Sequence, residues 1–206
     1  MRMRLDQVED YVDTVLALRK EYEKDIEIHL GLETEYFPKF WDQLIDFLSD
    51  YPFEYFLLGQ HSLGNEIEKI LYSGHGTTEE KYLKQYVDQC LAGLDTGKYL
   101  YLAHPDLFRF DGDEAVFDRE YRRLCREVKK RNIPLEINFL GLMEERWYPN
   151  ERFWKIAGEE GNTAVFGCDA HTPKAVWNPE TEQKALLLAE KYGLEVQETV
   201  PMPKTC

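Results

Sequence analysis

The sequence predicts a parallel α/β fold, in which short buried strands alternate with amphipathic helices. Five apolar runs of strand length are separated by stretches with the hydrophobic spacing of helices. The chain has 206 residues, 43% of them hydrophobic, so it can bury a substantial core within one domain, residues 1–206. This alternation fits either a closed barrel or an open sheet.

The first third of the chain predicts two strands, each preceded by a helix. Residues 5–24 carry apolar side chains at helical spacing and predict the first helix. Residues 25–33 (DIEIHLGLE) alternate apolar with polar side chains and predict the first strand. A helix is expected over residues 39–50, because Pro38 suits the start of a helix. The second strand is expected over residues 54–61 (EYFLLGQH).

The middle of the chain predicts two further helices, each followed by a strand. Residues 77–94 predict a helix opened by a threonine cap, and residues 98–104 (KYLYLAH) predict the third strand. Residues 113–132 predict a long helix whose C-terminal end is basic, as the helix dipole favours. Residues 134–141 (PLEINFLG) predict the fourth strand.

The last third predicts a helix over residues 150–161, the fifth strand over residues 163–171 and a final helix over residues 178–193. Asn178 can cap the final helix and Gly193 can end it. The chain therefore begins on a helix instead of a strand. In a barrel, that helix would need a preceding strand to pack against.

Charge and composition exclude several classes of partner. The formal net charge of −14 disfavours long nucleic acids, whose binding depends on lysine and arginine. A small anionic substrate is compatible with this charge, because bound cations invert the local field. No apolar run reaches the length of a membrane span, so no membrane partner is expected. The four cysteines are scattered, which indicates reduced thiols and a cytoplasmic location: Cys90, Cys125, Cys168 and Cys206.

Polar side chains that can bind metals close the predicted strands. They are Glu33, His61, His104, Asn138, Asp169 and His171. In parallel α/β folds the carboxyl ends of strands converge on one face, so we expect these side chains to meet there. A lone histidine after an apolar run is usually an ordinary polar residue, but three such endings in one chain are hard to explain by coincidence. Mixed imidazole and carboxylate ligands favour zinc, iron or manganese.

Five stretches in this order resemble the polymerase and histidinol phosphatase (PHP) superfamily, and most closely its histidinol-phosphatase branch. They are GLETEYFP (31–38), LLGQHSL (57–63), LAHPDLF (102–108), LEINFLG (135–141) and GCDAHTPKAV (167–176). The resemblance covers nearly the whole chain after the first predicted helix. It implies a distorted (β/α)7 barrel with a centre of up to three divalent metals that hydrolyses phosphate monoesters.

The resemblance also implies a role for each matching residue. Glu33 would bridge two metal ions, and His61 and His104 would complete the shell of the second. Asp169 would bind the first ion and His171 the third, and these two residues would also be catalytic, with Asp169 or a histidine handling the proton of the leaving group.

Arg109 follows His104 in the predicted loop. By the same resemblance it would contact the substrate phosphate. The alternative for Arg109 is an ordinary surface arginine.

The chain also departs from the pattern of the superfamily. Relatives begin with a strand that carries H-x-H, whereas the only histidine here before Glu33 is His29, which has no such partner. On this comparison we expect a barrel that lacks its first strands. A full three-metal site cannot be built from the ligands of this chain alone.

Three hypotheses follow. The first is a histidinol-phosphatase of histidine biosynthesis, acting on the small phosphorylated substrate L-histidinol phosphate. The second is a PHP phosphoesterase with another substrate, such as a phosphotyrosyl peptide or a nucleotide. The third is a truncated, catalytically impaired fragment that forms homo-oligomers through unpaired strand edges.

Overall fold

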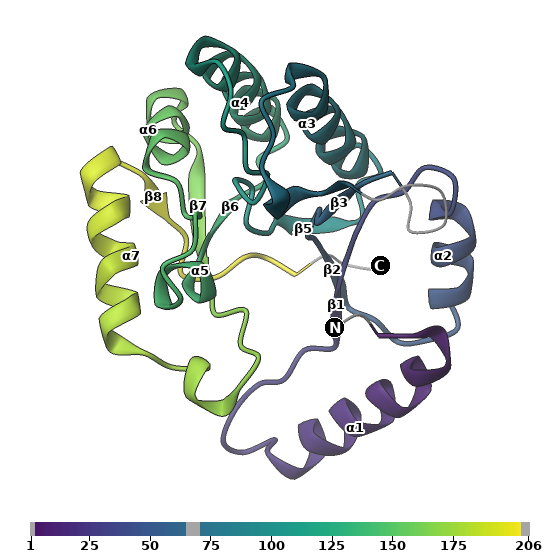
Figure 1. Cartoon of the computed structure of the whole chain (residues 1–206). Coiled ribbons are helices and arrows are strands. Elements are labelled where there is room, and N and C mark those ends of the chain that lie inside the picture. Colours follow the sequence, from purple (N-terminus) through teal and green to yellow (C-terminus); the bar gives the residue numbers. More distant parts are fainter. Residues whose placement is uncertain (1–2, 65–70, 203–206) are drawn as a thin grey trace.

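The computed structural model describes residues 3–64 and 71–202, which form a curved parallel sheet surrounded by helices (Figure 1). Six parallel strands pair in the order β1-β2-β5-β6-β7-β8. Their bounds are Gly31–Thr34 (β1), Tyr55–Leu58 (β2), Tyr99–Leu102 (β5), Leu135–Asn138 (β6), Thr163–Gly167 (β7) and Glu195–Val196 (β8). Strands β3 (Ser62–Leu63) and β4 (Leu71–Tyr72) form a separate antiparallel pair.

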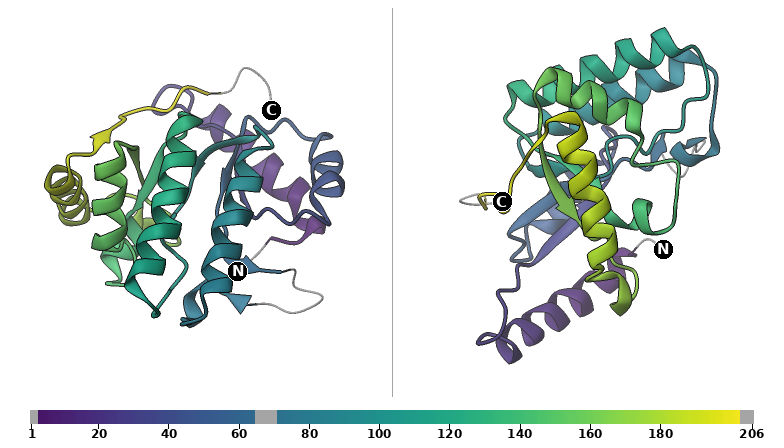
Figure 2. Two further views of the ribbon diagram at one scale, coloured as in Figure 1. Left: turned by 90° about the horizontal axis from the view of Figure 1, so that it is seen from above. Right: turned by 90° about the vertical axis from the view of Figure 1, so that its left-hand side faces the viewer.

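The helices lie outside the sheet. They are α1 (Val8–Glu21), α2 (Trp41–Leu48), α3 (Glu80–Leu94), α4 (Glu114–Lys130), α5 (Phe139–Met143), α6 (Glu151–Glu160) and α7 (Pro179–Tyr192), with short 3-10 turns at Leu5–Gln7, Ser73–His75 and Pro173–Ala175. Helices α3, α4 and α6 pack side by side along the strands (Figures 1 and 2). Within the described ranges, none of the helices is long and apolar enough to cross a bilayer.

The predicted parallel α/β fold is confirmed. Among the residues that the structure describes, β1 and β8 are the two edges of the sheet and do not pair with each other. The caps predicted for the last helix are present, since Asn178 accepts a hydrogen bond from the Thr181 N–H at 3.1 Å and Gly193 adopts the left-handed conformation.

Two predicted strands have wrong boundaries for identifiable reasons. The strand expected over residues 25–33 begins only at Gly31, because the Leu30 N–H is taken by the Glu54 carboxylate at 2.6 Å. The strand expected over residues 134–141 ends at Asn138, whose side chain accepts from the Gly141 N–H at 2.8 Å and so starts α5.

One predicted helix also begins later than expected. The helix expected over residues 77–94 starts at Glu80, and Glu79 occupies its cap position without a side-chain hydrogen bond to the helix. The Thr77 hydroxyl accepts instead from the Glu79 N–H at 3.1 Å, which forms a turn before the helix. The other predicted elements are present with ends shifted by a few residues.

The Glu54 side chain holds the residues just before β1 and therefore helps to place Glu33 within that strand. Its carboxylate accepts from the Leu30 N–H, pairs with Arg19 of α1 and lies 3.4 Å from His29 Nδ1. Burial alone would raise the pKa of Glu54, but these hydrogen bonds outweigh burial and lower it. The ionised carboxylate thus ties α1 to the entry of β1.

We expect Glu54→Gln to lower the melting temperature at neutral pH, by about 2–4 °C for each kcal/mol lost in a domain of this size. Because the folded-state pKa is lowered, the stabilisation exists above the unfolded pKa and is lost as pH falls through the folded one. Thermal unfolding of both proteins between pH 7 and 3 checks this. The two melting temperatures should converge at acidic pH, and a constant difference across that range would contradict the assignment.

Candidate metal centre

Glu33, His61 and His104 converge at the carboxyl ends of neighbouring strands. Glu33 lies in β1, His61 follows β2 and His104 follows β5. Glu33 Oε1 lies 3.2 Å from His104 Nε2 and 3.5 Å from His61 Nε2. One ligand atom from each of the three residues lies within 4.8 Å of the other two. The predicted meeting of these three side chains is therefore present.

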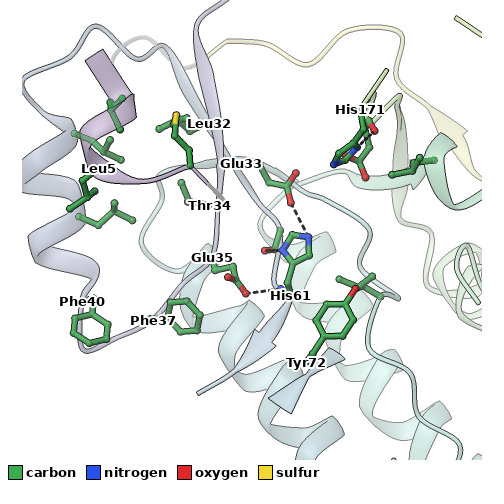
Figure 3. A pocket seen from close by; sticks show the side chains of 18 of the residues that line it. Leu5, Leu32, Glu33, Thr34, Glu35, Phe37, Phe40, His61, Tyr72 and His171 are labelled. Carbon is green, nitrogen blue, oxygen red and sulfur yellow. Dashed lines mark hydrogen bonds and ion pairs between the residues drawn. The ribbon is translucent and has the colours of Figure 1, made fainter. Parts of the chain in front are cut away.

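The residues around His61 leave room for Glu33 and orient the imidazole. A Cβ at Gly59 would collide with the Glu33 carboxylate, so a larger residue at this position would displace that carboxylate. The His61 backbone N–H donates to Glu35 Oε1 at 2.9 Å. His61 Nδ1 lies 2.9 Å from the Gly59 carbonyl, which requires a proton on Nδ1 and leaves the Nε2 lone pair directed at Glu33. Figure 3 shows the His61 ring facing Glu33.

His104 is held in a strained backbone conformation. Its φ is 28°, in the left-handed region that residues other than glycine seldom adopt, and its side chain is 2% exposed. The His104 backbone N–H donates to Glu136 Oε2 at 2.8 Å. Strained, buried residues of this kind concentrate at functional sites, where the surroundings hold them in place.

The electrostatics of the cluster favour a bound cation. Burial alone would lower the pKa of His104, but the hydrogen bond and charge of Glu33 raise that pKa to about 9. Burial would raise the pKa of Glu33, yet His104 and His61 lower it. Positive charge is thus stabilised at the point where the three ligand atoms meet. One carboxylate and two imidazoles are a ligand set that suits zinc, iron or manganese.

Asp169 and His171 follow β7 and line the same cavity as Glu33 and His61. Asp169 has a φ of 46°, and its Oδ2 accepts from Asn138 Nδ2 at 3.2 Å. Burial raises the pKa of Asp169. His171 Nδ1 lies 2.9 Å from the Asp169 carbonyl. These two predicted residues therefore share the cavity, although neither belongs to the compact group of three ligand atoms.

The cavity has a volume of about 1000 Å³ and two chemically different sides. Glu33, His61 and His171 lie on one side, and Leu5, Leu32, Phe37 and Phe40 lie on the other (Figure 3). A ligand here can place a charged group at the polar side while its remaining surface contacts apolar side chains.

The structure does not bring Arg109 to this cavity. Arg109 lines a neighbouring cavity of about 390 Å³, and its Nε donates to Asp111 Oδ1 at 3.2 Å. Arg146, which is not among the site residues predicted from the sequence, lines both cavities. It donates to the Tyr148 hydroxyl at 2.7 Å and to Glu144 Oε2 at 2.8 Å. Its position in a loop after a predicted strand is the signal that could have identified it.

Comparison with known proteins identifies relatives that are named histidinol-phosphatases. No protein-family model matches the chain. It is 26% identical over 196 residues to the histidinol-phosphatase of Bacillus subtilis, an alignment that covers 80% of this chain and 70% of that protein. It is 23% identical over 192 residues to a Deinococcus radiodurans protein named "Probable histidinol-phosphatase", covering 85% and 69% respectively.

A solved structure agrees with these sequence relatives. The histidinol phosphate phosphatase of Lactococcus lactis superposes with a TM-score of 0.69 at 21% identity, covering 96% of this chain and 80% of that one. That protein was crystallised with zinc, L-histidinol and phosphate. The chain is thus related in sequence to bacterial histidinol-phosphatases and shares their fold.

Proposed function

We propose that this protein is a metal-dependent phosphomonoesterase that hydrolyses L-histidinol phosphate to L-histidinol and phosphate. The convergence of Glu33, His61 and His104 beside a large cavity is the observation that carries this proposal. The histidinol-phosphatases among its relatives and the zinc, histidinol and phosphate bound by the Lactococcus lactis protein support the choice of substrate. Histidine biosynthesis is the pathway to which such a reaction belongs.

We propose that Glu33, His61 and His104 hold one divalent ion. A cation bound there supplies Lewis-acid polarisation of phosphoryl oxygens and activation of water. Glu33 would offset one of the two positive charges of that ion, and its Oε1 lies beside the Nε2 atoms of both imidazoles. Asp169 and His171 are the remaining predicted ligands and would contribute to a further ion, whereas the three ions of the superfamily pattern need ligands that this chain does not supply.

Asp169 and His171 also have proposed roles in proton transfer. Asp169 lines the cavity, and its Oδ2 is held by Asn138. A carboxyl group there can donate a proton to the leaving alkoxide of histidinol, and His171 beside it can exchange that proton with solvent. The Asn138 hydrogen bond keeps the Asp169 side chain from rotating away from the substrate.

The remaining parts of the proposal concern the whole chain. Residues 1–206 are proposed to be one PHP-type domain built on a distorted (β/α)7 barrel, supported by the curved parallel sheet (Figure 1) and by the cluster of buried apolar residues that the described part of the chain forms. The described cysteines Cys90, Cys125 and Cys168 are free thiols, which suits the cytoplasm. The acidic charge argues against nucleic acid as a partner, and the two sheet edges at β1 and β8 are compatible with homo-oligomers.

Phosphate release from L-histidinol phosphate tests the function. The protein is first treated with a chelator and then supplied with manganese, zinc or iron. We expect hydrolysis only after a metal is restored, and a preference for histidinol phosphate over phosphotyrosine and nucleoside monophosphates. Equal or faster hydrolysis of another monoester would assign a different substrate, and no hydrolysis with any metal would reject the phosphatase.

The phosphate of the substrate is proposed to bind an arginine, either the predicted Arg109 or Arg146 of the cavity wall. We expect Arg146→Ala to lower kcat/KM by about 10–100-fold, the effect of losing one charge-assisted hydrogen bond. Arg109→Ala should have a smaller effect, because Arg109 faces the neighbouring cavity and pairs with Asp111. Steady-state kinetics of both variants decide between them, and a loss confined to Arg109→Ala would assign the phosphate contact to Arg109.

A further inference from the structure

Glu136 is a buried carboxylate that lies outside the proposed ligand set. It occupies β6, between β5 and β7 in the sheet, and its side chain is only 4% exposed. A carboxylate this deeply buried is costly to place in the core unless it is hydrogen-bonded. Its partners therefore indicate what it does.

The hydrogen bonds of Glu136 connect it to His104 of the metal centre and, through Asn138, to Asp169. Glu136 Oε2 accepts the backbone N–H of His104 at 2.8 Å. The same oxygen accepts from Asn138 Nδ2 at 3.1 Å, and this nitrogen also donates to Asp169 Oδ2 at 3.2 Å. One oxygen atom of a β6 residue is thus bonded directly to His104, which follows β5, and is connected through Asn138 to Asp169, which follows β7.

The two residues held in this way have the same unusual backbone. His104 and Asp169 have φ angles of 28° and 46°, which residues other than glycine adopt only at an energetic cost. The sheet also makes room for Glu136, because a Cβ at Gly167 of β7 would collide with the Glu136 carboxylate. The arrangement thus needs a side chain of the length of glutamate at position 136 and a glycine at position 167.

We propose that Glu136 is a positioning residue that sets the spacing between His104 and Asp169 across the metal centre. This inference rests on the proposed function, since it assumes that His104 binds a metal ion and that Asp169 acts on the substrate. The length of the Glu136 side chain, and not its charge, is the property that matters. A neutral oxygen at the same place can accept the same two hydrogen bonds, from the His104 N–H and from Asn138 Nδ2.

Three variants separate reach from charge. Glu136→Asp keeps the charge but shortens the side chain by one methylene, so it loses the His104 N–H. Glu136→Gln loses the charge but keeps an oxygen within reach. Gly167→Ala leaves Glu136 in place and displaces its carboxylate. Glu120 offers a matched control, because it is 5% exposed, lies in α4 and pairs with Arg119 and Arg123, so Glu120→Asp shortens an equally buried glutamate elsewhere.

Titration with cobalt(II), followed by its visible absorption spectrum, reports the ligand geometry without any substrate. We expect Glu136→Asp and Gly167→Ala to weaken cobalt binding by about 10–100-fold, the usual effect of losing a group that orients a metal ligand, and to alter the spectrum. Glu136→Gln should bind within about threefold of the unmodified protein, as should Glu120→Asp. With histidinol phosphate, the loss in Glu136→Asp should appear in kcat more than in KM.

Three results would overturn the inference. Wild-type cobalt affinity and spectrum in both Glu136→Asp and Gly167→Ala would show that the contacts of Glu136 do not position His104. A loss in Glu136→Gln equal to that in Glu136→Asp would show that the charge of Glu136 matters as much as its reach, which contradicts the proposal. Failure of the unmodified protein to bind cobalt would reject the proposed metal centre itself, and this inference with it.

Discussion

Replacing Glu33 with alanine is expected to lower phosphate release from histidinol phosphate by about a thousandfold or more. Glu33 is the only carboxylate in the compact ligand group of the described residues, and its Oε1 faces both imidazoles. A metal ion contributes several kcal/mol of transition-state stabilisation, and each ~1.4 kcal/mol is a factor of ten in rate. Without Glu33, two imidazoles alone should hold the ion weakly.

Metal content by mass spectrometry and the rate of phosphate release check this prediction together. Glu33→Ala should lose both, whereas Glu27→Ala should lose neither, since Glu27 is exposed and pairs with His29. The alanine variant should also lower the pKa of His104, because Glu33 is the main group that raises it. A Glu33→Ala protein with normal metal content and rate would place the metal centre elsewhere.

Asp169→Asn is expected to lower kcat by about 10²–10⁴-fold, the usual contribution of a general acid or base. The substitution is nearly isosteric, and an asparagine oxygen can still accept the hydrogen bond from Asn138 Nδ2. The backbone of the loop should therefore be retained while the exchangeable proton is lost. The effect should be smaller on KM than on kcat.

Cobalt binding distinguishes the two roles proposed for Asp169. If Asp169 acts on the proton alone, Asp169→Asn should bind one cobalt ion at Glu33, His61 and His104 as the unmodified protein does. Asp118→Asn is a suitable control, because Asp118 lies on α4 and pairs with Arg152 on the outer layer. An unchanged kcat in Asp169→Asn would remove Asp169 from the chemistry.

Much of the site could be predicted from the sequence, because its residues follow a rule of the fold. Glu33, His61, His104 and Asp169 stand at or just after the ends of parallel strands, and strand order brings those ends together. The pattern needs only the alternation of strands and helices. The prediction of Glu33 does not depend on where its strand begins. β1 starts later than predicted, at Gly31, and Glu33 still lies near its carboxyl end.

The parts that could not be predicted depend on hydrogen bonds between distant residues. The early end of β6 results from the Asn138 cap of α5, and the late start of β1 from the contact of Glu54 with Leu30. In the sequence Glu136 looks like an ordinary strand residue, and only the three-dimensional fold brings its carboxylate to the backbone N–H of His104. The difference between Arg109 and Arg146 depends on which loop faces the cavity, which spacing along the chain does not encode.

Anomalous diffraction from crystals grown with zinc tests the central claim most directly. We expect a strong peak between Glu33 Oε1, His61 Nε2 and His104 Nε2, at about 2.0–2.2 Å from each donor atom. Additional peaks near Asp169 and His171 would be compatible with this account. A fully occupied zinc site elsewhere, with no peak at the three strand ends, would contradict it.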